Sequence, residues 1–186
     1  MTAAKPPLSR RERGRSLVTV QPEGVHAVMA VDPGGTTGVY AGWVDLKLTR
    51  RDTLTKGKLR ERAVEVTGDY LEQAKELGKI FIAFSYACNE ANIGVPNRHL
   101  AVEDFVLRRR QQGGATGNLT SIWVAAAFAS YISGLPNSEV TWQQPSSAKA
   151  LATDERLRDW GLWIKGSPHK RDAARHFALK VDSLIR

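Results

Sequence analysis

The stretch 30-AVDPGGTTGVY-40 decides the fold, because a carboxylate stands where an apolar run meets a glycine-rich turn. Small and apolar residues lead to Asp32, and Val39 and Tyr40 follow the turn. Side chains that alternate in polarity or size over such short runs are typical of β-strands. The stretch therefore predicts a strand, a tight turn and a second strand, with Asp32 at the end of the first strand.

Working outward from this hairpin, spacing and capping signals predict an α/β protein with the element order βββαβαβα. The expected elements are strands within 26–48, a weak strand at 52–55, a helix at 58–90 that either breaks at Gly78 or continues through it, a strand at 99–107, a helix at 119–133, a strand at 139–143, a short charged helix near 153–160 and a last helix from 168. Asn118 is the expected N-cap of the helix at 119–133. Ser167 and Pro168 are the expected start of the last helix.

Length, charge and cysteine content narrow the class of protein. The 186 residues fit one domain, expected over 25–186, and the formal net charge of +8 with a pI of about 9.9 favours polyanionic partners such as nucleic acid. The single cysteine, Cys88, excludes an intrachain disulfide and a cysteine-based zinc site, which indicates a reducing compartment. No apolar window is long enough to span a membrane. Residues 1–24 are expected to form a flexible basic arm, which either adds affinity for phosphates or has no role.

Three acids stand at the ends of predicted core elements: Asp32, Glu103 and Asp172. Carboxylates that lie together are unfavourable unless cations neutralise them, and Mg²⁺ or Mn²⁺ bound by oxygen ligands does this in enzymes that cleave phosphodiesters. His169 and His176 are spaced three residues before and four residues after Asp172, so the three side chains share one helix face. An apolar stripe lies on roughly the opposite face, so the His/Asp face is not expected to be core packing.

Three short motifs together resemble the RuvC family of Holliday-junction resolvases, within the RNase H-like superfamily. They are "VDPGGTTG", "AVEDF" and "HKRDAARH", and the resemblance spans residues 28 to about 181. It implies an RNase H-like mixed sheet, a structure-selective endonuclease with a two-metal Mg²⁺ or Mn²⁺ site, branched DNA such as four-way junctions or flaps as substrate, and a homodimer that makes paired nicks. It also implies the cytoplasm of a bacterium or of a phage-infected host.

The resemblance carries roles to individual residues. Asp32, Glu103 and Asp172 would be metal ligands, and His169 would position or deprotonate the attacking water. Residues expected to contact DNA are Phe105, Arg108, Arg109, Arg110, Lys149, Lys170 and Arg171.

Three departures from the family pattern leave alternatives open. Phe105 follows Glu103 more closely than the family motif usually has it, which puts its role as a wedge between bases in doubt. Asp104 competes with Glu103 as the ligand, and strand alternation allows only one of them into the site. Segment 79–98 is longer than expected between the first helix and the fourth strand. It is either an insertion or simply a longer helix.

Two other functions compete with the nuclease. The first hairpin of actin-like and sugar-kinase proteins also reads Asp-x-Gly-Gly-Thr and cradles ATP phosphates. Those proteins resemble two linked copies of this topology, so a chain of 186 residues would supply one wall of the nucleotide cleft and leave the His/Asp helix unexplained. The second is a module that binds branched DNA without cutting it, although all three acids are present.

Overall fold

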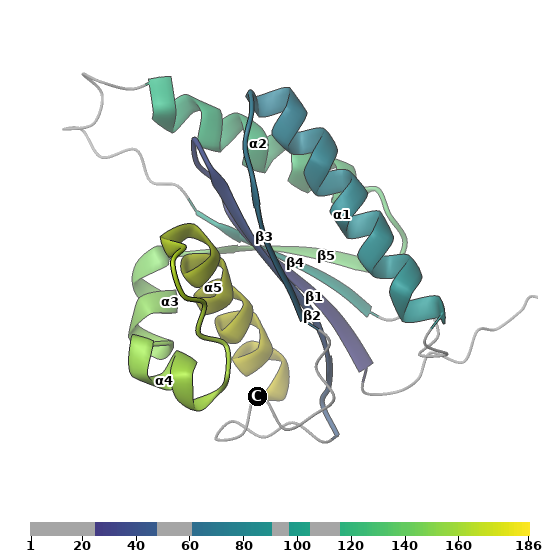
Figure 1. Ribbon diagram of the computed structural model, residues 1–186. Helices are drawn as coiled ribbons and strands as arrows, with labels where there is room; N and C mark the ends of the chain where they lie inside the picture. Colours follow the sequence, from purple (N-terminus) through teal and green to yellow (C-terminus); the bar gives the residue numbers. More distant parts are fainter. Residues whose placement is uncertain (1–24, 48–60, 91–96, 105–115) are drawn as a thin grey trace, which may run out of the picture.

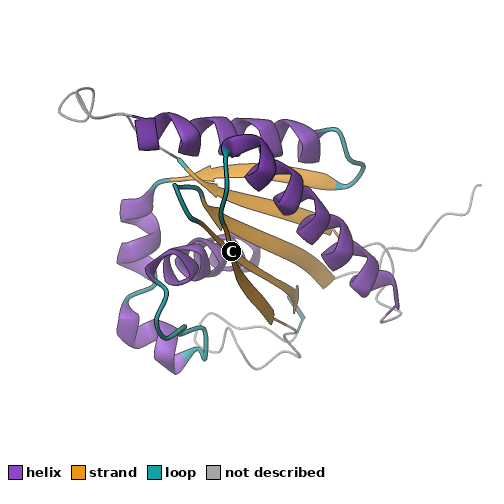
Figure 2. Ribbon diagram, turned by 45° about the horizontal axis from the view of Figure 1, so that its top comes forward, coloured by secondary structure: helices purple, strands orange, loops and turns teal. Residues whose placement is uncertain are grey.

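The computed structural model describes residues 25–47, 61–90, 97–104 and 116–186. The elements, in chain order, are β1 (Val25–Asp32), β2 (Thr37–Asp45), β3 (Glu61–Val66), α1 (Tyr70–Glu90), β4 (Asn97–Glu103), α2 (Thr116–Ser133), β5 (Ser138–Gln143), α3 (Pro145–Leu151), α4 (Asp154–Asp159) and α5 (Pro168–Ile185). They form three layers, with α1 and α2 on one side of the sheet and α3, α4 and α5 on the other (Figures 1 and 2). Among the described residues, no helix combines the length and apolarity needed to cross a bilayer.

The sheet is mixed, and its strand order is β3-β2-β1-β4-β5. β1, β2 and β3 form an antiparallel meander, whereas β4 and β5 run parallel to β1. α1 connects β3 to β4 and α2 connects β4 to β5, as parallel strands require a crossover connection. This arrangement confirms the predicted α/β class.

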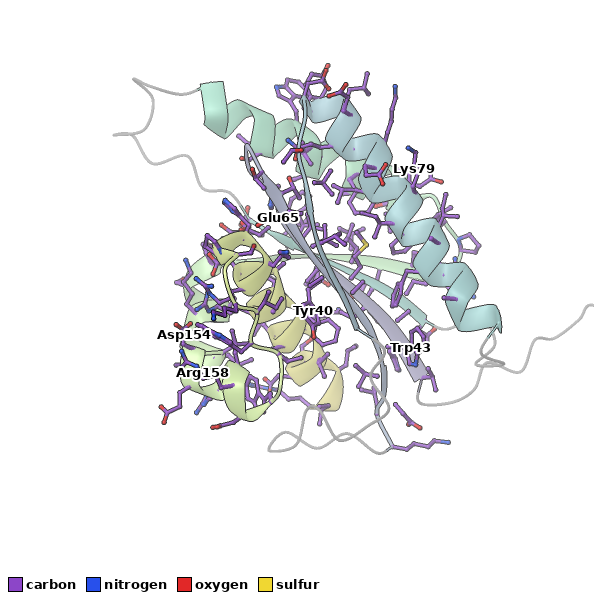
Figure 3. The ribbon with its side chains drawn as sticks, viewed as in Figure 1. Tyr40, Trp43, Glu65, Lys79, Asp154 and Arg158 are labelled. Carbon is purple, nitrogen blue, oxygen red and sulfur yellow. The ribbon has the colours of Figure 1, made fainter. Side chains whose placement is uncertain are left out.

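Each face of the central strand packs against a different helix layer, because side chains alternate along a strand. Val28 and Ala30 belong to the core under α5, and Met29 and Val31 belong to the core under α1 and α2. On the next strand, Tyr40 also points toward α5 (Figure 3), and its ring lies tilted against that of Phe177, with the centroids 4.9 Å apart. The same alternation directs Asp32 toward the α5 layer.

The prediction of one helix over 58–90 is wrong in its first part. Residues 61–66 form β3, which pairs with β2, and the helix begins at Tyr70. Gly68 takes a positive φ of 119°, and the Asp69 carboxylate accepts the main-chain N–H of Glu72 at 2.9 Å while the Glu72 carboxylate accepts that of Asp69 at 3.1 Å. This reciprocal capping box marks the true start of the helix. α1 then runs without a break to Glu90, so the extra length of 79–98 is partly a longer helix.

The other element boundaries follow the sequence more closely. Strands in 26–48 and at 139–143, the short helix near 153–160 and the last helix from 168 are confirmed by β1, β2, β5, α4 and α5. α2 begins at Thr116, so Asn118 is not its N-cap. The helix α3 was not predicted; the proline at its first position sets a favourable φ for the first turn. The weak strand at 52–55 and the end of the predicted strand at 105–107 lie outside the described residues.

Candidate active site

Strand register and helix placement bring the three acids to one end of the sheet. β1 and β4 are parallel, and Val31 pairs with Val102, so Asp32 and Glu103 follow at the adjacent carboxyl ends of these strands. Both alternate away from the α1 and α2 layer and toward α5, which carries Asp172 near its first turn. We call Asp32, Glu103 and Asp172 the carboxylate cluster.

The start of α5 is held against the sheet by two contacts from neighbouring strands. Ser167 is the N-cap, as predicted: its hydroxyl accepts the main-chain N–H of Lys170 at 3.1 Å, and it donates to the carboxylate of Glu65 on β3. On β2, a Cβ added to Gly38 would lie 2.1 Å from the carbonyl oxygen of His169. The missing side chain at Gly38 therefore lets the first turn of α5 lie directly over the start of β2, where Gly38 pairs with Asp32 at the end of β1.

The environment of Asp32 is strongly unfavourable for a negative charge. Burial raises its pKa to about 8, with further increases from the nearby charges of Glu103 and Asp172 and from a hydrogen bond with Glu103, while the charge of Lys149 opposes the shift. Asp32 thus lies near two other acids in a buried place that disfavours its charged form. Such a group of acids is a common feature of sites that bind cations.

His169 lies beside Asp32, at the solvent side of the cluster. Its Nδ1 is 3.3 Å from Oδ2 of Asp32, and 43% of its side chain is exposed. When Nδ1–H donates to the carboxylate, Nε2 is the basic atom of the ring. The geometry therefore allows His169 to orient against Asp32 and to accept a proton at Nε2.

Asp172 is paired with two cations. The guanidinium of Arg175 donates to one of its oxygens, and Nζ of Lys149 is 3.5 Å from the other. Arg175 also donates to the carboxylate of Asp154 and, at 3.1 Å from Nε, to the carbonyl oxygen of Ala152. Arg175 thus fixes α3 and α4 to α5. The sequence did not predict this role, because it depends on contacts between residues that are distant in the chain.

Glu103 is paired with His176, at a distance of 3.0 Å between Oε2 and Nε2. The other ring nitrogen of His176 is 3.0 Å from the side chain of Gln143 on β5, and only 1% of His176 is exposed. The expectation that this face of α5 lies outside the core is wrong for His176, because the ends of β4 and β5 cover it. Gln143 was also missed, although it ends a predicted strand.

Among solved structures, the chain is similar to RuvC of Thermus thermophilus in complex with a Holliday junction substrate. The TM-score is 0.50 with 22% sequence identity, and the match covers 86% of this chain and 96% of that chain. The chain has the RuvC fold. A second structure of Thermus thermophilus RuvC matches with a TM-score of 0.48 and 19% identity over the same shares. No protein-family model matches the sequence, and no curated protein matches it.

Within this RuvC fold, the choice between Glu103 and Asp104 is clear from their contacts. Asp104 accepts a hydrogen bond from the side chain of Gln144, and its main-chain N–H donates to the carbonyl oxygen of Gln143 at 2.8 Å. Glu103 instead contacts His176 and Asp32. The structure therefore brings Glu103 into the carboxylate cluster and leaves Asp104 outside it.

The residues predicted to contact DNA are only partly described. Phe105 and residues 108–110 lie outside the described residues. Lys149 contacts the carboxylate cluster directly. Arg171 points away from the cluster, since it donates to the carbonyl oxygen of Ile164 at 3.2 Å and stacks at 4.8 Å on the ring of Trp163.

The donor chemistry of the cluster fits Mg²⁺ or Mn²⁺, although the side chains are turned to protein partners. In the described ranges, no three or more His, Cys, Asp or Glu side chains are arranged to hold a metal ion. The reason is that Asp172 faces Arg175 and Lys149, while Glu103 faces His176. Carboxylate oxygens are nevertheless the preferred ligands of these cations, and burial with the neighbouring acids Glu103 and Asp172 raises the pKa of Asp32.

Proposed function

We propose that this chain is a metal-dependent endonuclease that cleaves phosphodiester bonds in branched DNA and resolves four-way junctions by paired nicks. The observation that carries the proposal is the convergence of Asp32, Glu103 and Asp172, which burial and mutual repulsion make unfavourable in the absence of a cation. The fold shared with RuvC, whose Thermus thermophilus protein has been solved with a Holliday junction substrate, supports branched DNA as the ligand.

The carboxylate cluster and His169 would have separate roles in hydrolysis. Asp32, Glu103 and Asp172 would hold two Mg²⁺ or Mn²⁺ ions, which supply an activated water and stabilisation of the leaving oxygen. His169 would orient its ring against Asp32 and take the proton of the water at Nε2. Asp172 would have to turn from Arg175 and Lys149 to join the ligand set. Arg175 would keep its bonds to Asp154 and Ala152, and Lys149, whose side chain is 57% exposed, would then be free to pair with a DNA phosphate.

The basic character of the chain supports a polyanionic substrate. The formal net charge is +8, and Lys149 lies at the carboxylate cluster itself. Lys170 lies in the same first turns of α5 as Asp172. Cations beside an acidic site attract DNA phosphates, and each phosphate contact adds a salt-dependent share to affinity.

A second copy of the chain is the partner that paired nicks require, and the exposed face of α1 and α2 suits it. Trp123 is 59% exposed and Tyr131 is 48% exposed on α2, and the ring centroid of Tyr70 lies 6.4 Å from that of Trp123. Large exposed aromatic side chains that gather on one face are typical of protein interfaces. Sedimentation should show a dimer for the wild type and a monomer for Tyr131→Glu; an unchanged dimer would place the interface elsewhere.

The proposed activity is tested by incubating the protein with Mg²⁺ or Mn²⁺ and a panel of end-labelled DNAs: a four-way junction, a flap and a linear duplex of matched sequence. We expect nicks in two opposed strands of the junction, no cleavage in EDTA and little cleavage of the linear duplex. Tight junction binding without nicks in either metal would instead support the alternative, a module that binds branched DNA without cleaving it.

A further inference from the structure

His176 occupies a buried position that connects two neighbouring strand ends. Glu103 and Gln143 are paired residues of β4 and β5, so their side chains lie next to each other on the face that α5 covers. His176, one helical turn beyond Asp172, contacts both: Nε2 lies 3.0 Å from Glu103, and Nδ1 lies 3.0 Å from Gln143. All polar atoms of the ring thus have partners within the protein.

The hydrogen bonds of Gln143 determine which ring nitrogen carries the proton. Only one orientation of its amide pairs donors with acceptors, and amide orientation is assigned from such networks. In that orientation the amide nitrogen donates to Nδ1 and to the main-chain carbonyl of His176, both at 3.0 Å, and the amide oxygen accepts the main-chain N–H of Lys180 at 3.3 Å. Because Nδ1 accepts a hydrogen bond, the proton of the neutral ring lies on Nε2 and is donated to Glu103.

We propose that His176 is a positioning residue that holds the Glu103 carboxylate in the orientation needed to bind a divalent cation, with Gln143 selecting its tautomer. The inference rests on the proposed function, in which Glu103 is a metal ligand. The hydrogen bond fixes Oε2, and an ion between the two acids would replace the hydrogen bond that Glu103 makes with Asp32. A neutral donor orients the carboxylate without adding a positive charge that would repel the ion, in contrast to Arg175 beside Asp172.

A purely structural role is the competing explanation, since any buried histidine needs hydrogen-bond partners. The two roles differ in what a substitution changes. If His176 only fills space, an apolar residue of similar size would alter stability and leave metal affinity as it is. If it positions Glu103, the donor at Nε2 matters, and a side chain that keeps an N–H at that place would keep metal affinity.

The first test reads the tautomer in the metal-free wild-type protein by long-range ¹H–¹⁵N NMR at neutral pH, with the His176 signals assigned by their loss in His176→Gln. We expect protonated Nε2 and unprotonated Nδ1. A proton on Nδ1 would overturn the inference, because the ring could then not donate to Glu103. This readout is independent of metal binding and cleavage.

The second test titrates Mn²⁺ alone into the wild type, His176→Leu and His176→Gln, with affinity read from free Mn²⁺ by electron paramagnetic resonance. We expect Leu to weaken binding by about 10–100-fold and Gln, whose amide reaches the place of Nε2, to restore most of it. His99→Leu is the matched control, because His99 is likewise a buried histidine with a carboxylate partner, Glu139, but lies on β4 at the end of the strand opposite to Glu103. It should bind Mn²⁺ as the wild type does.

The outcomes separate this inference from the proposed function. If the wild type binds Mn²⁺ and cleaves junctions while His176→Leu, folded by circular dichroism, binds Mn²⁺ equally well, the positioning role is wrong and the nuclease stands. Equal loss of affinity in the Leu and Gln variants also contradicts it. If the wild type neither binds Mn²⁺ nor cleaves, the proposed function fails and the role of Glu103 fails with it.

Discussion

Removing the charge of Asp32 should stabilise the metal-free protein. In the folded chain, burial, together with Glu103 and Asp172, raises the pKa of Asp32 from its ordinary 3.8 to about 8. A raised folded-state pKa means that the contribution of Asp32 to stability is fully present below pH 3.8 and is lost as the pH rises toward 8. Asp32→Asn keeps the shape of the side chain and does not titrate, so it escapes this loss.

The size of the effect follows from the width of the pH window. Each pH unit above the ordinary pKa of Asp32 lowers the free energy of unfolding by about 1.4 kcal/mol, so the decrease at pH 7 approaches about 4 kcal/mol. Charge shared among the three carboxylates reduces this, and we expect Asp32→Asn to raise the free energy of unfolding by roughly 2–4 kcal/mol at pH 7. The gain should shrink to near zero at about pH 4.

The measurement is urea unfolding of the metal-free wild type and of Asp32→Asn in EDTA at several pH values. Asp104→Asn is the control, because it removes the same charge next to Glu103 but outside the carboxylate cluster. Added Mn²⁺ should stabilise the wild type more than Asp32→Asn, by mass action. An Asn variant that is less stable than the wild type at pH 7, or a difference that does not grow with pH, would refute the raised pKa of Asp32 that burial and the two neighbouring acids cause.

Three further predictions follow from single contacts. His169→Ala should lower the cleavage rate by a factor of about 10²–10⁴ without weakening junction binding, and His169→Asp should have a rate between those of the Ala variant and the wild type. A wild-type rate in the Ala variant would exclude His169 as the proton acceptor. Gly38→Ala should destabilise the protein by about 1–3 kcal/mol in urea unfolding, because its Cβ would meet the carbonyl oxygen of His169; unchanged stability would show that α5 does not press on β2. Burial, with the charge of Lys180, lowers the pKa of His99 to about 4. The free energy of unfolding of the wild type should therefore fall by up to about 3 kcal/mol as the pH falls from 6.5 toward 4, and His99→Leu should lack this part of the decrease.

Local signals were sufficient wherever neighbouring residues determine the structure. The glycine-rich turn after Asp32 and the Ser167–Pro168 start of the last helix were predicted correctly, because a turn and an N-cap depend on a few adjacent residues. The same kind of signal was overlooked at Asp69 and Glu72, where a capping box outweighs the apolar spacing that suggested a helix from residue 58.

The pairings inside the site depend on contacts between distant segments and could not be predicted in this way. Strand alternation shows that only one of Glu103 and Asp104 can face the site, but the register of β4 against β1 decides which. The parallel register of β4 and β5 likewise places Gln143 beside Glu103, and α5 then lays His176 over both. A spacing argument on α5 alone placed His176 correctly beside Asp172 along the helix and wrongly outside the core.

Single-turnover cleavage of an end-labelled four-way junction in Mn²⁺ tests most directly whether the carboxylate cluster is a nuclease site. The wild type should nick two opposed strands, and Asp104→Asn should do so at a similar rate. Asp32→Asn should leave the junction uncut while binding it as tightly as the wild type or more tightly, because one negative charge near the phosphates is gone. Cleavage by Asp32→Asn at most of the wild-type rate, or wild-type cleavage that persists in EDTA, would contradict the assignment.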